Sequence, residues 1–255
     1  MEILLEAKEL SKSYLLSPDH EQHVLKDINV QIKKGEFVSV MGPSGSGKST
    51  FLYNISGMDK LSTGSVVFAG EELSSFSEVE LSNLRLNKMG FIFQNIHLLK
   101  NLSILDNIVL TAYMAKKRSR SDINNRAKEI MMRSGIAELA NNDISQASGG
   151  QLQRVAICRA LINNPDILFG DEPTGALNSK SASEIMDILA DINQSGTAIL
   201  LVTHDVKVAA KSERVLFMID GCIVDELLLG KYIKGDEDNK KREVRLTDWL
   251  SKMGF

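Results

Sequence analysis

Cysteine is scarce in this sequence of 255 residues, and a long apolar run is absent. The two cysteines, Cys158 and Cys222, are too few for a disulfide framework and favour a reduced, cytoplasmic setting. No apolar stretch approaches the roughly 18 residues of a membrane span, and the acidic start MEILLEAKEL does not resemble a signal peptide. If the protein works at a membrane, we expect another chain to provide the spans.

A surplus of positive charge is also missing, because 30 basic and 33 acidic residues leave a net charge of −3. Proteins that bind nucleic acid usually carry a basic surplus, so we expect no nucleic-acid partner. The hydrophobic fraction of 43% is enough to bury the core of one large domain, or of one domain with a subdomain.

Strand-like and helix-like patterns alternate along the chain, which predicts an α/β fold. Residues 28–32 alternate apolar and polar side chains and 36–41 form a more continuous apolar strand, a combination typical of a mixed sheet. A helical pattern covers most of 78–163, and strand–helix–strand patterning returns from residue 165. The pair Asp220-Gly221 between two apolar runs predicts a hairpin.

The composition changes after residue 230. Residues 235–243, GDEDNKKRE, are charged and predicted to be solvated, and 245–255 form a short amphipathic segment. Two interpretations stay open for its Trp249, which either docks on another protein or packs back on the domain. The basic run KKRSR at 116–120 is interpreted as a solvated helix end, with contact to lipid headgroups as the alternative.

A glycine- and serine-rich stretch lies between the second predicted strand and a helical pattern. Residues 42–49 match G-x-x-x-x-G-K-[ST], a phosphate-binding loop. A triphosphate concentrates negative charge, so many backbone N–H groups must point inward; glycines permit this, and a helix N-terminus adds its dipole. We predict that Lys48 reaches the β- and γ-phosphates and that Ser49 ligates Mg²⁺. The predicted loop comprises Gly42, Pro43, Ser44, Gly45, Ser46, Gly47, Lys48, Ser49 and Thr50.

Two adjacent carboxylates follow the apolar residues 167–169. Asp171 is placed at the carboxyl end of this predicted strand, where a P-loop ATPase holds Mg²⁺ with a second carboxylate. Glu172 is a candidate to polarise an attacking water. Adjacent strand residues point to opposite faces, so both can serve one site only where the strand ends. The alternative is an acidic turn before Pro173.

The segment ASGGQLQR at 147–154 combines a helix start with two glycines. Ser148 precedes Gln151 by three residues, the spacing of a capping box. Gly149 and Gly150 just inside a helix cost stability, which makes sense if this N-terminus approaches a phosphate closely. The motif follows Lys48 by 100 residues, so it need not reach the phosphate loop of its own chain. A loop before an ordinary core helix is the alternative.

With these motifs in this order, followed by a histidine after a further strand, residues 5–225 resemble the ATP-binding cassette (ABC) ATPases. The resemblance implies an α/β P-loop NTPase core of mixed sheet with helices, a small antiparallel β subdomain and a helical signature subdomain. It implies an ATPase domain at 1–229, with the helical part at about 95–163 and a C-terminal extension at 230–255. It also implies ATP and Mg²⁺ as cofactors, and a head-to-tail homodimer in which the SGGQ helix of one copy caps the ATP of the other.

The resemblance also implies roles for single residues. Tyr14 looks like the aromatic residue that stacks on adenine, and Gln94 like the loop glutamine that contacts Mg²⁺ and the γ-phosphate. His204 looks like the switch histidine, catalytic together with Glu172. The implied metal ligands are Ser49, Gln94 and Asp171, and the partner-facing nucleotide contacts are Ser148, Gly149, Gly150 and Gln151.

Two positions depart from the family pattern. Ala147 stands where leucine is usual, and Asn178 stands where aspartate usually helps to couple the two sites of the dimer. The Asn178 departure puts the cooperativity of hydrolysis in question.

Residues 81–108 and 171–182 resemble one subgroup, which contains lipoprotein-release, macrolide-export, peptide-antibiotic-resistance and cell-division ATPases. This implies a subunit on the cytoplasmic side of the membrane that drives an integral-membrane permease through ATP-dependent dimer closure. A signalling or cell-division platform without a translocated substrate is the alternative. A chromosome or repair ATPase is disfavoured, because no sustained heptads separate the phosphate loop from SGGQ.

Overall fold

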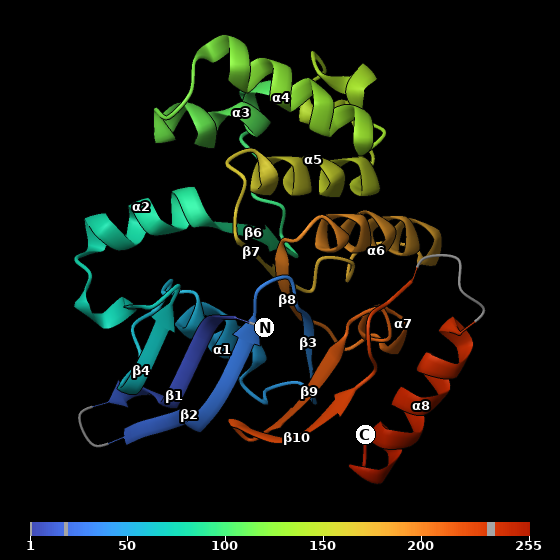
Figure 1. Ribbon diagram of the computed structural model, residues 1–255. Helices are drawn as coiled ribbons and strands as arrows, with labels where there is room; N and C mark the ends of the chain where they lie inside the picture. The colour runs from blue at the N-terminus through green and yellow to red at the C-terminus, as the bar shows by residue number, and fades with distance from the viewer. Residues whose placement is uncertain (1, 18–19, 234–237) are drawn as a thin grey trace.

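A six-stranded sheet forms the centre of the computed structural model, which describes residues 2–17, 20–233 and 238–255 (Figure 1). Its strand order is β10-β9-β3-β8-β7-β6, and all neighbours are parallel except β10 and β9. Strands β3 and β8 are buried along their whole length, as expected for parallel strands covered on both faces. The strands are β3 Phe37–Met41, β6 Met89–Phe93, β7 Ile167–Asp171, β8 Ala198–Val202, β9 Arg214–Ile219 and β10 Cys222–Leu228.

The hairpin predicted at Asp220-Gly221 is confirmed: the antiparallel pair β9–β10 turns there, with φ of 48° and 84° at the two residues. A second, antiparallel sheet has the order β2-β1-β4-β5. The predicted strand at 28–32 lies within its long strand β2. The four strands are β1 Ile3–Ser17, β2 His20–Lys33, β4 Thr63–Phe68 and β5 Glu71–Glu72.

Successive side chains along the central strands point to opposite faces of the sheet and therefore enter different hydrophobic cores. Val38 and Val40 face the core shared with the antiparallel sheet and with helix α1 (Lys48–Ile55), which contributes Phe51. Phe37 faces the opposite core, which contains Leu189 of helix α6 (Ser179–Gln194). The phosphate loop therefore connects a fully buried strand to a helix that is itself fixed between two sheets.

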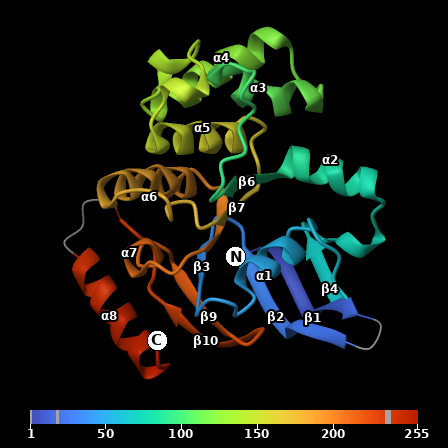
Figure 2. The same ribbon diagram turned by 180° about the vertical axis from the view of Figure 1, so that it is seen from behind.

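Helices α3 (Ile104–Ala115), α4 (Arg120–Arg133) and α5 (Gly149–Leu161) lie together beyond the end of the central sheet, and Figure 2 shows them from behind. They have their own apolar core, which includes Ile108 and Met131. The expectation of a mostly helical 78–163 was wrong at one point. After α2 (Glu78–Lys88), residues Met89–Phe93 form β6, because Met89 and Ile92 are buried against the neighbouring layers.

Among the residues that the structure describes, there are also the short helix α7 (Val206–Ala209) and three short 3₁₀ segments. The 3₁₀ segments are Leu73–Ser75, Ala137–Leu139 and Ile144–Gln146. None of the helices in the described part of the chain combines the length and hydropathy that crossing a membrane requires.

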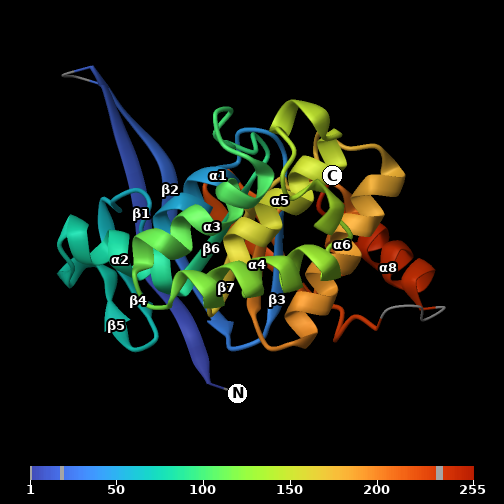
Figure 3. The ribbon, with the colours of Figure 1, turned by 90° about the horizontal axis from the view of Figure 1, so that it is seen from above.

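Helix α8 (Asn239–Lys252) packs against the domain on the side opposite to β1 and β2 (Figure 3). Leu246 and Leu250 are buried with Phe217, and the Trp249 indole donates a 2.9 Å hydrogen bond to Asp225, so Trp249 packs back on the domain. The prediction that 235–243 are solvated was wrong for Arg242, which is buried; residues 235–237 lie outside the described residues.

Arg242 is buried because its guanidinium satisfies four backbone acceptors. It donates to the carbonyl oxygens of Ala210, Ser212, Leu229 and Gly230 at 2.7–3.0 Å. This side chain joins α8 to the segments on either side of the β9–β10 hairpin.

Candidate functional site

The loop between β3 and α1 has the backbone that a compact anion requires. Gly42 has a φ of 152°, and a Cβ there would lie 2.0 Å from the Met218 carbonyl oxygen, so only glycine fits. Gly47, with a φ of 96°, is the N-cap of α1 and provides no side-chain cap. The first N–H groups of α1 therefore have no partner from the capping residue, and a helix start in this state binds anions readily.

Lys48 is a buried cation held by backbone alone. Its side chain donates to the carbonyl oxygens of Gly42 at 3.0 Å and Pro43 at 2.8 Å. Burial lowers the pKa of Lys48, while the carboxylates of Glu172 and Asp171 oppose that shift. The nearby Ser46 hydroxyl is buried and has no hydrogen-bond partner among the described residues. A buried ammonium and an orphaned hydroxyl in one loop fit a bound phosphate group.

Ser49 and Asp171 meet at the end of β7. The Ser49 hydroxyl donates to Asp171 Oδ1 at 2.9 Å, and the Tyr53 hydroxyl donates to Oδ2 at 2.8 Å. Burial and this carboxylate raise the pKa of Tyr53 to about 12. The hydroxyl and carboxylate oxygens are hard ligands of the kind that Mg²⁺ prefers, with its other positions left to phosphate oxygens and water.

Glu172 and His204 form a second pair. Nδ1 of His204 lies 3.0 Å from Oε1 of Glu172. Glu172 has a φ of 45°, a left-handed conformation that is unusual and strained for a non-glycine residue. The strand therefore ends at Asp171, and the backbone turns so that the two adjacent carboxylates need not point to opposite faces.

Lys48, Ser49, Glu172 and His204 line one cavity of about 530 Å³, whereas Asp171 lies behind Ser49 and is not part of the lining. The phosphate loop forms most of its wall, and Glu172 and His204 complete it. Phe255, which the sequence did not single out, lies on the same wall, as does Val24. The lining residues are Val24, Gly42, Ser44, Gly45, Gly47, Lys48, Ser49, Thr50, Glu172, His204 and Phe255.

The side chains of Gln94 and Glu172 both lie close to Gly175. A Cβ at Gly175 would lie 3.2 Å from Nε2 of Gln94 and 3.3 Å from Oε2 of Glu172. A Cβ at position 175 would therefore require one of these side chains to shift by a few tenths of an ångström. Gln94 follows directly after β6, so it connects the candidate site with the strand that leads to helices α3 to α5.

Tyr14 lies near the phosphate loop but does not line the cavity. Its hydroxyl donates to Asp59 at 2.7 Å, and Lys12 Nζ lies 4.6 Å from the ring centroid. Burial and Asp59 raise the pKa of Tyr14 to about 12, while a hydrogen bond with Thr50 lowers it. The side chain is 38% exposed, so the ring retains surface on which a base can stack.

The SGGQ segment starts helix α5 as its spacing predicts. Ser148 is the N-cap, its backbone N–H donates to Gln151 Oε1 at 2.8 Å, and the capping box is complete. None of Ser148, Gly149, Gly150 and Gln151 lines the cavity of its own phosphate loop. Asn178 caps the neighbouring helix α6 by accepting a 2.9 Å hydrogen bond from the Ser181 N–H, a function that asparagine and aspartate perform equally.

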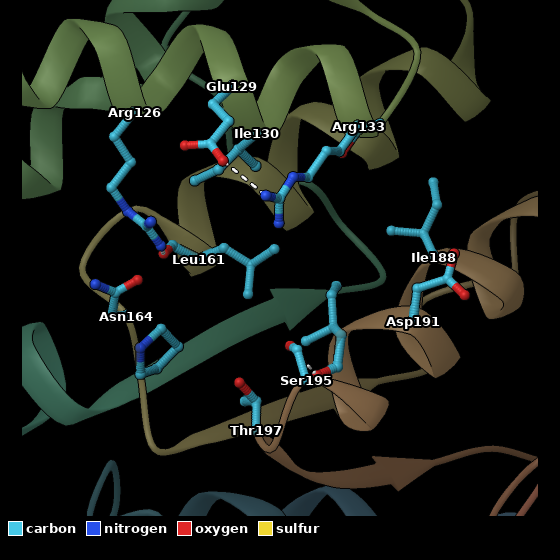
Figure 4. Close-up of a pocket in the computed structure, with 13 residues that line it drawn as sticks. Arg126, Glu129, Ile130, Arg133, Leu161, Asn164, Ile188, Asp191, Ser195 and Thr197 are labelled. Carbon is cyan, nitrogen blue, oxygen red and sulfur yellow. Dashed lines mark hydrogen bonds and ion pairs between the residues drawn. The ribbon is translucent and has the colours of Figure 1, made fainter.

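A separate cavity of about 590 Å³ lies between α4 and α6 (Figure 4). Its arginines are already engaged: Arg126 donates to the Leu161 and Ile162 carbonyl oxygens, and Arg133 to Glu129. None of the predicted site residues lines it. Of the predicted site residues, the phosphate loop, Glu172 and His204 therefore meet at one cavity, and Tyr14, Gln94, Asp171 and the SGGQ segment lie outside its lining.

Comparison with known proteins places this chain among the ABC transporter ATPases. The family model described as "ABC transporter" matches residues 25–175. The bacitracin export ATP-binding protein BceA of Halalkalibacterium halodurans is 42% identical over 238 residues, which cover 93% of this chain and 91% of that protein. A probable export ATP-binding/permease protein, MacB of Pseudomonas entomophila, is 44% identical over 211 residues, 83% of this chain. The chain spans only 32% of the length of that MacB relative.

Solved structures match the whole architecture. The ATP-binding cassette MJ0796, in a dimeric post-hydrolysis state bound to ADP and Pi, has a TM-score of 0.83 and 38% identity. The match covers 90% of this chain and 100% of that chain. The predicted fold of a mixed sheet with helices and a small antiparallel sheet is therefore confirmed.

Proposed function

The chain belongs to the ABC transporter family as an ATPase that hydrolyses ATP to ADP and phosphate, and from that premise we propose that it drives a separate membrane permease. The proposed task is resistance to antimicrobial peptides or drugs, or a related mechanical transmission of the lipoprotein-release type. The match over 91% of BceA supports this proposal, because that relative is an export ATP-binding protein of similar extent.

The convergence of Lys48, Ser49, Glu172 and His204 on one cavity is the observation that carries the assignment of ATP hydrolysis to these residues. The loop N–H groups and the Lys48 ammonium bind the β- and γ-phosphates. Mg²⁺, when bound through Ser49, Asp171 and Gln94, neutralises charge on the phosphate oxygens.

Glu172 acts on the attacking water. Its carboxylate accepts a proton from the water as the water oxygen bonds to the γ-phosphorus and the bond to the ADP oxygen breaks. Nδ1 of His204, 3.0 Å from Oε1 of Glu172, holds that carboxylate in place, and we propose that His204 also contacts the γ-phosphate. Tyr14 offers its ring to the adenine. Asp171 keeps the Ser49 hydroxyl oriented through their hydrogen bond before the metal binds.

The second half of each site comes from a second copy of the chain. Ser148, Gly149, Gly150 and Gln151 lie at a helix start with glycines, away from their own cavity, which supports contact with the nucleotide of a partner. The dimeric MJ0796 cassette supports the same arrangement. ATP then joins two copies, and its hydrolysis lets them separate.

The permease docks in a groove of about 540 Å³ beside Gln94. The groove is lined by apolar side chains, including Phe91, Phe93 and the exposed Met58 and Leu99, and by polar ones such as Arg85, His97 and Arg159. A short amphipathic helix of the permease fits such a surface. Because β6 connects the groove to Gln94, closure at the nucleotide changes the groove that the permease occupies.

The proposal is tested by co-expressing the full chain with its permease and measuring ATP turnover and bacitracin tolerance. We expect the permease to raise ATP turnover, and we expect cells to gain tolerance that the Glu172→Gln variant abolishes. ATP turnover without any tolerance to bacitracin or other peptide antibiotics would favour the signalling or division platform. Failure of the two subunits to form a complex would contradict the proposal.

A further inference from the structure

The segment after helix α8 is built to hold one aromatic side chain in a fixed place. The Gly254 N–H donates to the Ser251 carbonyl oxygen and the Phe255 N–H to that of Leu250, the paired bonds of a Schellman motif. Gly254 has a φ of 80°, as this motif requires. The bonds turn the chain back across the end of α8 and point residue 255 toward the sheet.

Aromatic packing fixes Phe255 further. Its ring packs edge-to-face on Phe217 with centroids 5.5 Å apart, and Phe217 packs in the same way on Trp249 at 5.8 Å. Trp249 is anchored by its hydrogen bond to Asp225. Phe255 is therefore preorganised by its ring contact with Phe217 and by its backbone hydrogen bond to Leu250, although it remains 43% exposed.

The exposed part of Phe255 lies on the wall of the nucleotide cavity. That wall includes Ser44 and Gly45 at the tip of the phosphate loop and the switch residue His204. In the proposed dimer, these are the residues over which the SGGQ helix of the partner must close. A rigid, exposed aromatic side chain at this point has the properties of an interface anchor, because its apolar surface stays in water until a partner covers it.

We infer that residues 253–255 form part of the surface that contacts the second copy of the chain when ATP closes the dimer, with Phe255 as the apolar anchor. This inference rests on the proposed head-to-tail dimer. It assigns helix α8 a role in the ATP cycle, because the helix positions that anchor.

The test measures ATP-dependent dimerisation in the Glu172→Gln background by analytical ultracentrifugation. Phe255→Ala should raise the ATP concentration at half-maximal dimer formation by about five-fold, the effect of losing one partly buried aromatic contact. Val244→Ala is the matched control, since Val244 is an exposed apolar residue of the preceding helix α8 that does not line the nucleotide cavity. Circular dichroism melting confirms that each variant folds.

The outcomes separate this inference from the proposed dimer. If Glu172→Gln dimerises with ATP and Phe255→Ala does so at the same or a lower ATP concentration, the anchor is disproved and the dimer stands. If Phe255→Ala changes ATP affinity in a monomeric Ser148→Arg background by more than two-fold, Phe255 contacts nucleotide and the inference is overturned. If Glu172→Gln itself never dimerises, the proposed function fails first.

Discussion

Ser49 and Asp171 are 122 residues apart in the sequence, and the Ser49 hydroxyl donates a 2.9 Å hydrogen bond to the Asp171 carboxylate. The contact joins the first turn of α1 to the carboxyl end of β7, a strand of the central sheet on which α1 packs. The fold thus already holds together the two oxygen groups that we propose as metal ligands.

Asp171→Asn is expected to weaken the activation of ATP hydrolysis by Mg²⁺. The amide keeps the size of the side chain but removes its charge, so Mg²⁺ loses a ligand and ATP turnover should fall at least about 100-fold. Mg²⁺ titration of ATP turnover measures the effect. Tyr53→Phe is the control, because it removes only the second hydrogen bond to Asp171 and should leave turnover within about three-fold.

Glu172→Gln should keep ATP binding and lose turnover. The amide cannot accept a proton from water, and the loss of a general base typically costs about 10²- to 10⁴-fold in rate. His204→Ala should lower turnover as well, because the carboxylate loses its partner at 3.0 Å. Steady-state phosphate release measures the turnover of each variant, and equilibrium binding of ATP shows whether binding is retained. Normal turnover in Glu172→Gln would refute the assignment of the base.

ATP affinity should depend on pH through Lys48. Burial lowers the pKa of its ammonium in the free protein, and a bound phosphate favours the protonated form. ATP binding therefore takes up protons, and affinity falls as the pH rises through the lowered pKa of the free protein. Calorimetry in buffers of different ionisation enthalpy measures this uptake.

Two substitutions of Lys48 distinguish the contribution of its positive charge to ATP binding from the pH dependence caused by its titration. Lys48→Arg, whose guanidinium stays protonated, should remove the pH dependence of ATP binding. Lys48→Ala should weaken ATP binding by about 2 kcal/mol at neutral pH, because the phosphates lose a charged donor. Normal affinity in Lys48→Ala would remove Lys48 from the phosphate site.

Arg242→Ala should destabilise the protein by about 3 kcal/mol, since four carbonyl oxygens lose their donors and a cavity remains. Urea unfolding measures the change. Arg245→Ala on the exposed face of the same helix is the control and should change the free energy of unfolding by no more than about 0.5 kcal/mol. Equal effects of the two substitutions would show that burial of Arg242 contributes nothing.

Local sequence patterns predicted secondary-structure elements and motifs, but they did not predict contacts between segments that are distant in the sequence. The spacing of Ser148 and Gln151 predicted a capping box, and Asp220-Gly221 a hairpin, because each signal is complete within a few residues. Tyr53 and Phe255 gave no such signal. Tyr53 reaches Asp171 only through the packing of α1 against β7, and Phe255 reaches the cavity only because α8 folds back on β9.

The burial of Arg242 also could not be predicted from local sequence. Its neighbours in the sequence are charged, so the composition predicted a solvated segment. The guanidinium is buried because the carbonyl groups that surround it come from segments 12 to 32 residues away. The β6 strand was missed for a related reason, since it is a short apolar run next to helices and its sheet partner β7 lies far along the chain.

Sedimentation of the Glu172→Gln protein with ATP and Mg²⁺ tests the central claim most directly. The account predicts a species of twice the monomer mass that reverts to monomer when ATP is replaced by ADP, and predicts that Ser148→Arg prevents its formation. A protein that binds ATP yet sediments as a monomer, both alone and together with its permease, would contradict the account.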